Sequence, residues 1–234
     1  MVDANYRGRT KEIGKVVVFS TEKQFNLLPI NSVKPENNSL AYIDDNGHIS
    51  FCNLQTEDGV YLLGFLHLTS KLNKDPIMQA LYGKDYITFI NQQKLIQQKK
   101  SNFKGTIITG DFNLNPFDIS MYFRNGFHAT NYLKSKEHSY YNPMFSLLGG
   151  HIYKSSSLKP AGTYLLNRLD RHDPYEIHWN LLDGVIFEPK LISNFVFESL
   201  QIVDKISDKH VLYLNEVISA SYSDHLPIFY EFNL

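Results

Sequence analysis

The sequence predicts an α/β (α+β) chain built as a four-layer sandwich, with two packed, mainly antiparallel sheets and helices on the outside. Short runs rich in β-branched and aromatic residues outnumber the helical stretches, and such runs are typical of strands. The 16 Phe and 15 Tyr residues against one Trp indicate an aromatic, β-rich interior. Few connections between the runs have the pattern of a regular strand–helix–strand crossover, which favours two packed sheets.

The expected strands follow one another along the whole chain. Residues 15–20 contain three consecutive valines and are expected to form an interior strand. Asn46-Gly47 predicts a hairpin between residues 39–43 and 48–53, which contain the single cysteine, Cys52, as a small buried residue. The other predicted strands comprise residues 60–68, 106–109, 162–166, 181–187, 195–203 and 228–232.

A helix is expected to begin at Asp75-Pro76, because an N-cap carboxylate followed by proline is a helix start. Gly83 is a point at which this helix is expected to divide in two. The apolar residues expected on its buried side are Ile77, Leu81, Ile87, Ile90 and Leu95. A second, short helix is predicted between residues 115 and 126. Residues 127–160 lack periodicity and predict a long surface loop, to which the sequence assigns no role.

Composition and charge limit the classes of protein to which the chain belongs. A length of 234 residues predicts a single domain, residues 1–234, and a hydrophobic fraction of 43% is that of a globular protein. With a formal net charge of −1, no global positive field collects nucleic acid, so a polyanion must meet a local patch or a bound cation. No signal-peptide core and no run of eighteen apolar residues occurs, which predicts a cytoplasmic location and no membrane partner.

The stretch Gly110-Asp111-Phe112-Asn113 follows the apolar run of residues 106–109. Gly110 allows a sharp turn, because it has no Cβ to forbid a positive φ. Beyond the turn, the Asp111 carboxylate can accept a proton or orient a water molecule, and the Asn113 amide can donate to a phosphate oxygen. The alternative is an ordinary turn, in which aspartate and asparagine are common.

Polar side chains also stand at the ends of other predicted strands, at His67, Asp183 and Asp224-His225. Residues so far apart in the sequence meet only if the strand ends share one rim. Hydrolysis of a phosphate ester requires such a group: a base for water, donors for the phosphate oxygens and a carboxylate-bound cation. The alternatives are a plain strand end for His67, a hairpin for Asp183 and a turn for Asp224.

Three motifs in this order resemble the endonuclease/exonuclease/phosphatase superfamily, which has the deoxyribonuclease I-like fold. They are Gly-Asp-Phe-Asn, then Leu-Asp-Gly-Val-Ile-Phe at residues 182–187, then Ser-Asp-His-Leu-Pro at residues 223–227. His67, in Gly-Phe-Leu-His-Leu, matches an earlier histidine of the family. The resemblance extends from residue 15 to the C-terminus. Within the superfamily, a bacterial subgroup is resembled by three stretches, Tyr141-Asn142-Pro143-Met144, Gly162-Thr163-Tyr164 and His178-Trp179-Asn180.

The resemblance implies a metal-dependent phosphoesterase in which His225, Asp183, Asp111 and His67 are the catalytic residues. His225 is the acid/base imidazole, and Asp183 holds it through its other ring nitrogen. Asp111 orients or deprotonates the attacking water. The resemblance leaves open which carboxylate takes the proton.

The remaining implied roles concern the phosphate and the metal. Asn113 and His67 bind the substrate phosphate, and Asp224 lies beside a divalent cation, Mg²⁺ or Mn²⁺. Members of the family also have a Trp-Asn-like pair on a first strand and a metal-binding glutamate at the end of a later one. Nothing before Lys15 matches these elements, and Glu12 and Glu22 stand in the wrong context. The sandwich is therefore expected to be incomplete at its N-terminal side, with a missing N-terminal segment or a partner chain to complete it.

These observations predict a divalent-metal-dependent phosphodiester hydrolase, with a nuclease acting on DNA or RNA as the first choice. The alternative is a phosphatase or phosphodiesterase for small-molecule or lipid phosphates. A further alternative is a non-catalytic relic or binding module, because Asp224 alone would hold Mg²⁺ weakly. An in-frame Trp-Asn and a later Gln-Glu in the DNA upstream of Met1 would favour the enzyme.

Overall fold

The structure is a computed structural model that describes residues 9–13, 16–20, 26–29, 48–68, 76–99, 102–131, 139–148, 160–166, 179–207, 210–214, 217–219, 221 and 223–234. Side chains are described from residue 48 onward, except at 76–82, 210, 214 and 217. The predicted hairpin at Asn46-Gly47 and its strand of residues 39–43 lie outside the described residues, as do the side chains of Ile77 and Leu81.

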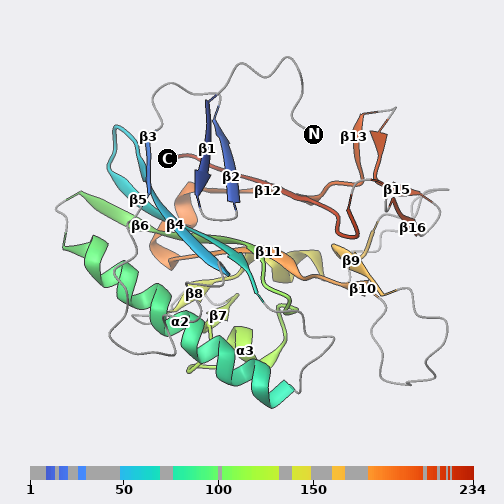
Figure 1. Cartoon of the computed structure of the whole chain (residues 1–234), viewed down its shortest axis with the longest axis horizontal. Helices are drawn as coiled ribbons and strands as arrows, with labels where there is room; N and C mark the ends of the chain where they lie inside the picture. Colours follow the sequence, from blue (N-terminus) through green and yellow to red (C-terminus); the bar gives the residue numbers. More distant parts are fainter. Residues whose placement is uncertain are drawn as a thin grey trace.

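A seven-stranded mixed sheet forms the centre of the structure (Figure 1). Its order is β3 (Asn26–Pro29), β4 (Ile49–Gln55), β5 (Val60–His67), β6 (Phe103–Asp111), β11 (Asp183–Phe187), β8 (Tyr140–Tyr141) and β7 (Ala129–Thr130). The pairs β5–β6 and β7–β8 are parallel, and the other neighbours are antiparallel. The predicted runs of residues 60–68, 106–109 and 181–187 are therefore the central strands of one sheet.

Alternation along the central strands divides the core into two clusters, because successive side chains of a strand point to opposite faces. On one face, Ile108 and Ile186 pack with the helices α2 (Pro76–Gln98) and α3 (Ile119–Tyr122). On the other face, Ile107 and Val185 pack against the antiparallel pair β12 (Phe195–Ile202) and β17 (Ile228–Phe232). The fold is thus an α/β sandwich, as predicted.

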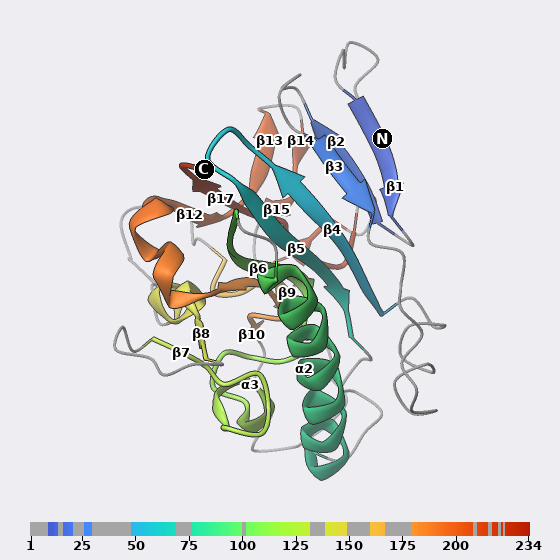
Figure 2. The ribbon, with the colours of Figure 1, turned by 90° about the vertical axis from the view of Figure 1, so that its left-hand side faces the viewer.

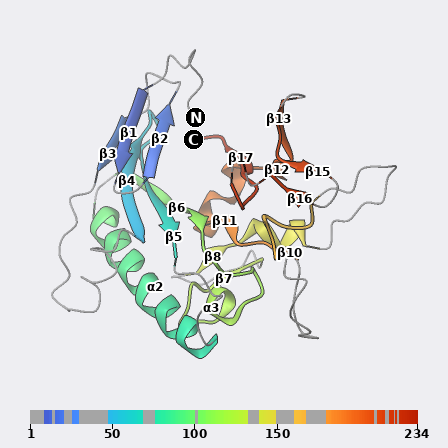
Figure 3. The same ribbon diagram turned by 45° about the vertical axis from the view of Figure 1, so that its right-hand side comes forward.

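Figures 2 and 3 show how the helices and the second sheet lie relative to the main sheet. The helix α2 lies along one side of the main sheet, and β12 and β17 lie on the opposite side. The other described α-helix, α3, lies on the same side of the main sheet as α2. A helical layer outside the second sheet is therefore not among the described residues. No helix in the described part of the chain is long and apolar enough to cross a membrane.

The helix α2 begins at Pro76, as predicted, but two expectations about it are wrong. Gly83 does not divide the helix, which continues to Gln98; a Cβ at Gly83 would lie 3.0 Å from the Ser120 Cβ, so glycine allows α3 to approach. Leu95 is 51% exposed. The buried face instead continues beyond Ile90 through the polar residues Gln93, Lys94 and Gln97.

The segment of residues 127–160 is not simply a surface loop. Its described part contains β7, β8 and the 3₁₀ helix η2 (Pro143–Leu147). Phe127, Ala129 and Tyr140 are completely buried, and Met144 nearly so. Sequence periodicity did not reveal these strands because each is only two residues long.

Small two-stranded sheets complete the description. Residues 16–20 form β2 (Val16–Ser20), which pairs with β1 (Arg9–Ile13) in a sheet of two strands, so among the described residues it is not the expected interior strand. The pair β9 (Tyr164–Leu165) and β10 (Trp179–Asn180) lies near the C-terminal segment. The sequence did not indicate four further strands, β13 (Lys205–Ser207), β14 (His210–Val211), β15 (Tyr213–Leu214) and β16 (Val217–Ile218). A 3₁₀ helix, η3 (Pro189–Asn194), joins β11 to β12.

Candidate functional site

Asp111 ends β6 at a turn that fixes both of its carboxylate oxygens. Gly110 has φ +133°, and a Cβ there would collide with the Leu66 carbonyl oxygen, so this position requires glycine. Asn113 adopts the left-handed conformation, with φ 51°. Its backbone N donates to Asp111 Oδ1 at 2.8 Å, and its Nδ2 donates to Asp111 Oδ2 at 2.9 Å. The carboxylate is therefore held in one orientation.

Asp183 lies beside Asp111 because of the register between two strands. The Cα atoms of these residues are direct partners in the antiparallel pairing of β6 and β11. His225 approaches from the C-terminal segment, and its Nδ1 lies 2.7 Å from Asp183 Oδ2. The side chains of His225 and Asp183 are 21% and 20% exposed. Three residues from separate parts of the chain thus meet at one end of the main sheet.

The charges at this end of the sheet perturb one another. Burial raises the pKa of the Asp111 carboxyl above its ordinary value, and the charge of Asp183 raises it further; the Asn113 hydrogen bond and the two imidazoles offset part of this effect. Burial alone would lower the pKa of His225. The hydrogen bond to Asp183 and the charges of Asp183, Asp111 and Asp224 outweigh burial, so this pKa is raised.

The other residues proposed from the sequence lie around this group. His67 is the parallel-strand partner of Asp111, with Nε2 3.8 Å from Asp111 Oδ2 and a side chain that is 75% exposed. Asp224 is exposed and acts on His225 through its charge. Asn113 uses both hydrogens of Nδ2 within the protein, on Asp111 and on the Leu68 carbonyl oxygen at 2.8 Å. A phosphate contact from this amide would require one of these bonds to be exchanged, so its phosphate role stays a prediction.

A buried polar network beneath the site was missed by the sequence reasoning. Asn115 Nδ2 donates to Asn180 Oδ1 at 2.9 Å, and Asn115 Oδ1 accepts from the Leu181 N–H at 2.8 Å. Thr163 Oγ1 accepts from the N–H groups of Leu182 and Asp183. Asn115, Thr163 and Asn180 are at most 6% exposed. The sequence signals were the likenesses of Gly162-Thr163-Tyr164 and His178-Trp179-Asn180 to a bacterial subgroup, and neither assigned a role to these residues.

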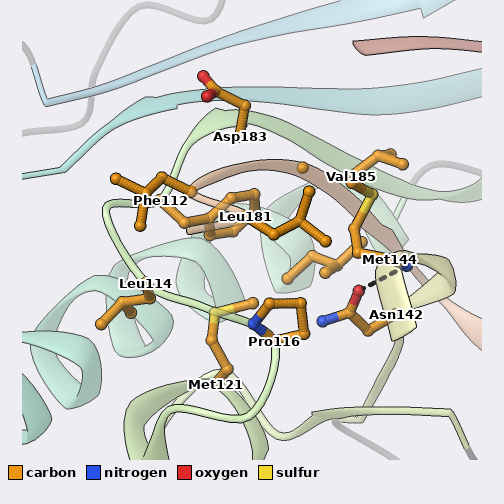
Figure 4. A pocket seen from close by; sticks show the side chains of 12 residues that line it. Phe112, Leu114, Pro116, Met121, Asn142, Met144, Leu181, Asp183 and Val185 are labelled. Carbon is orange, nitrogen blue, oxygen red and sulfur yellow. Dashed lines mark hydrogen bonds between the residues drawn. The ribbon is translucent and has the colours of Figure 1, made fainter. Parts of the chain in front are cut away.

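A small pocket lies behind Asp183 (Figure 4). The Asp183 carboxylate points away from it, and the Asn142 amide lies on its far side, where Asn142 Oδ1 accepts from the Met144 N–H at 3.0 Å. Most of the lining is apolar, with Phe112, Leu114, Pro116, Met121, Met144 and Leu181 among the residues. The polar chemistry of the site is therefore on the side of the carboxylate and not in this pocket.

The residues of the site form a possible metal-binding group. Asp111, Asp183 and His225 each offer one ligand atom, and these atoms lie within 4.8 Å of one another. Carboxylate oxygens suit a hard divalent cation, which takes one or two carboxylates and keeps several water molecules. Burial and the charge of Asp183 both disfavour the ionised form of Asp111, and a bound cation would offset both effects. The donor set therefore fits such an ion, and the place of Asp224 beside it stays a prediction.

Comparison with known proteins finds matches among solved structures. No family model and no curated protein matches the chain. The endonuclease domain of TRAS1, a telomere-specific non-LTR retrotransposon, matches 93% of this chain and 73% of its own, with 10% identity and a TM-score of 0.44. An AP endonuclease from Archaeoglobus fulgidus matches 89% and 72%, with 13% identity and a TM-score of 0.46. An endonuclease/exonuclease/phosphatase family protein from Leptotrichia buccalis matches 91% and 62%, with 13% identity and a TM-score of 0.41.

These structural neighbours all have the endonuclease/exonuclease/phosphatase, or deoxyribonuclease I-like, fold, with which the sandwich described above is consistent. The three TM-scores are below 0.5 and the identities are 10–13%, so these matches carry no argument about the site. No residue role is transferred from them, and the roles below rest on the contacts within this chain.

Proposed function

We propose that this chain is a divalent-metal-dependent phosphodiester hydrolase, and that its substrate is DNA or RNA. The observation that supports the proposal is the group of Asp111, Asp183 and His225, in which one imidazole and two carboxylates from three segments share one strand end. Hydrolysis of a phosphodiester requires a proton acceptor for water, a donor for the leaving oxygen and positive charge near the phosphate. The group contains side chains of the types that these tasks require.

In this proposal the imidazole of His225 transfers a proton at Nε2. Its Nδ1 is held by Asp183, which fixes the tautomer and stabilises the imidazolium. Nε2 has no hydrogen-bond partner among the described residues, so it is the nitrogen that would face the substrate. The raised pKa of His225 favours the protonated form, which suits an acid that donates to a leaving oxygen.

Asp111 would orient or deprotonate the attacking water. Its raised pKa makes the carboxylate a better proton acceptor than an ordinary aspartate, and Asn113 fixes its direction. His67, exposed beside Asp111, would contact the phosphate. Asp111 and Asp183, with Asp224 nearby, would hold Mg²⁺ or Mn²⁺. That ion supplies positive charge for phosphate oxygens on which negative charge develops.

A phosphatase or phosphodiesterase for small-molecule or lipid phosphates is the second candidate. The observation that favours it is the formal net charge of −1, because strong binding of nucleic acid usually depends on a basic surface that releases counterions. A small phosphate ester does not require such a surface.

Two assays with Mg²⁺ test the proposal and separate the candidates: nicking of a supercoiled plasmid and hydrolysis of a panel of phosphomonoesters. We expect nicking, and we expect it to be lost in His225→Ala and strongly reduced in Asp183→Asn. Asp58→Asn is a matched control for the second variant, because Asp58 is an exposed aspartate in the β4–β5 turn, at the other end of the sheet. Hydrolysis of phosphomonoesters alone would favour the second candidate. Full activity of His225→Ala, or no hydrolysis of any phosphate ester, would contradict the proposal.

A further inference from the structure

One buried threonine contacts both segments that carry the Asp183–His225 pair. Thr163 is completely buried. Its Oγ1 accepts from the N–H groups of Leu182 and Asp183, each at 3.1 Å, where β11 begins. Its carbonyl oxygen accepts from the N–H of Leu226 at 2.7 Å, next to His225. Thr163 is therefore bonded on one side to Asp183 and on the other to the neighbour of His225.

We propose that Thr163 is the positioning residue that aligns Asp183 with His225, a role that rests on the function proposed above. The two partners approach from strands that are not paired with each other. Asp183 belongs to the main sheet, and His225 belongs to the segment that leads to β17. Among the described residues, Thr163 is the one whose hydrogen bonds join these two segments directly beside the pair.

The surroundings of Thr163 restrict its own movement. Its backbone N–H donates to the Asn180 carbonyl oxygen at 2.9 Å, and a Cβ at the preceding Gly162 would collide with that same oxygen. Asn180 is in turn bonded through its side chain to Asn115, four residues after Asp111. Thr163 is therefore held against the turn that carries the other carboxylate of the site.

The residue after Thr163 supports the ring of His225. Tyr164 forms an antiparallel bridge with His225, and their rings lie 5.0 Å apart at an angle of 49°. The short segment of residues 162–164 thus holds the imidazole through the backbone and a ring contact, and holds the carboxylate through Oγ1. The position of the pair depends on this segment as well as on the two residues themselves.

The threonine hydroxyl is the part that can be removed without a change of shape. Thr163→Val keeps the branched side chain but leaves the N–H groups of Leu182 and Asp183 without their acceptor. Thr163→Ser keeps the acceptor. Thr106→Val is a matched control, because Thr106 is also completely buried in the main sheet and its Oγ1 has no hydrogen-bond partner.

The test compares these three variants with the wild-type protein in two measurements. In hydrolysis, we expect kcat of Thr163→Val to fall by about 100-fold, the effect of a displacement of about 1 Å at a reacting group. KM should change little, and Thr163→Ser should recover most of the rate. In NMR of the metal-free protein, the signal of the hydrogen-bonded Nδ1 proton of His225 should weaken or shift in Thr163→Val. The signal should remain unchanged in Thr163→Ser and Thr106→Val.

The NMR measurement separates this proposal from the function on which it rests. If the wild-type protein hydrolyses no phosphate ester, the proposed function fails, but the response of the His225 proton still tests the alignment. An unchanged His225 signal in Thr163→Val, or equal damage by Thr163→Ser, would overturn the positioning role. If Thr163→Val does not fold, amide exchange in the wild-type protein decides. Slow exchange of the Leu182 and Asp183 amides is expected, and exchange as fast as in an unstructured peptide would overturn the positioning role.

Discussion

Charged side chains lie at both ends of the main sheet, buried at one end and partly buried at the other, and the two ends balance the charge differently. At the end away from the site, Lys94 Nζ lies 2.6 Å from Glu188 Oε1, and the two side chains are 6% and 8% exposed. At the site end, the carboxylates of Asp111 and Asp183 lie side by side with one imidazole. The first end has a buried cation for its anion, whereas at the second the nearby partners of the two carboxylates are imidazoles, which are charged only when protonated.

The difference teaches which charges serve stability and which remain available for chemistry. Glu188 is matched by the buried Lys94 and also lies 3.7 Å from Lys190, so this end has little need of a further ion. At the site end, burial and then the charge of Asp183 raise the pKa of Asp111. The hydrogen bond to Asp183 and the charges of the nearby carboxylates raise the pKa of His225 against the effect of burial. Perturbed groups of this kind are typical of functional sites, whereas a matched buried pair is typical of structure.

The largest expected effect is on the rate of hydrolysis, at the site end. Asp183→Asn keeps the shape of the side chain but removes the charge that stabilises the His225 imidazolium. We expect kcat to fall by about 10²–10⁴-fold, the range for loss of general acid–base catalysis, while the free energy of unfolding changes little. Steady-state kinetics and urea unfolding measure the two quantities. A large loss of stability with a normal kcat would reverse the roles given to the two ends.

The converse substitution is Glu188→Gln, which leaves Lys94 buried without its charge partner. We expect the free energy of unfolding to fall by about 3–5 kcal/mol, as when one partner of a buried ion pair is removed. The rate of hydrolysis by the folded protein should stay normal. Urea unfolding measures the change, with Glu231→Gln as the control, because Glu231 is exposed. A change below about 1 kcal/mol, the usual range of a surface pair, would show that the burial of this pair has little weight.

Addition of Mg²⁺ should also distinguish the two ends, through a smaller change in the free energy of unfolding. At a concentration about tenfold above its dissociation constant, an ion that binds only the folded state stabilises it by about 1.4 kcal/mol. We expect this gain in the wild-type protein and in Glu188→Gln, and its loss in Asp183→Asn. Thermal unfolding with Mg²⁺ and with EDTA measures it. An equal gain in Asp183→Asn would place the ion elsewhere.

The smallest expected effect is a dependence of stability on pH that comes from the site end. The pKa values of Asp111 and His225 are raised in the folded state, so protonation of each favours folding. Their contribution is complete below the unfolded pKa and is lost as pH rises through the folded pKa. For His225 this predicts a decrease in stability above pH 6.5, measured by urea unfolding at several pH values in EDTA. Asp183→Asn should flatten the decrease, and a steeper one would contradict the assignment.

Much of the fold followed from local patterns in the sequence. The β-branched residues of 106–109 and the apolar run of 60–68 predicted strands, and Pro76 marked the start of α2. The two-residue strands β7 and β8 were not predicted, because no periodicity can be seen over so short a length. Leu95 was misplaced because hydrophobicity alone defined the buried face, whereas Lys94 and Gln97 occupy it.

The candidate site, like the fold, was predicted from the sequence only in part. Asp111, Asp183 and His225 were singled out because they stand at strand ends in a familiar order, and the structure brings these three together. Their assigned roles, and those of His67 and Asp224, stay predictions. The likeness of Gly162-Thr163-Tyr164 to a subgroup named no function for Thr163, since a threonine among turn residues carries no chemical signal of its own.

The sequence by itself therefore determined where most strands and the long helix lie and which residue types stand at the strand ends. These features depend on the conformational preferences and periodicity of neighbouring residues. Only the tertiary structure decided that the amide of Asn113 is used within the protein, that Lys94 pairs with Glu188, and that Thr163 joins Asp183 to the segment of His225. Each of these depends on a contact with a distant part of the chain, and such contacts are set by strand register and packing, which no local pattern contains.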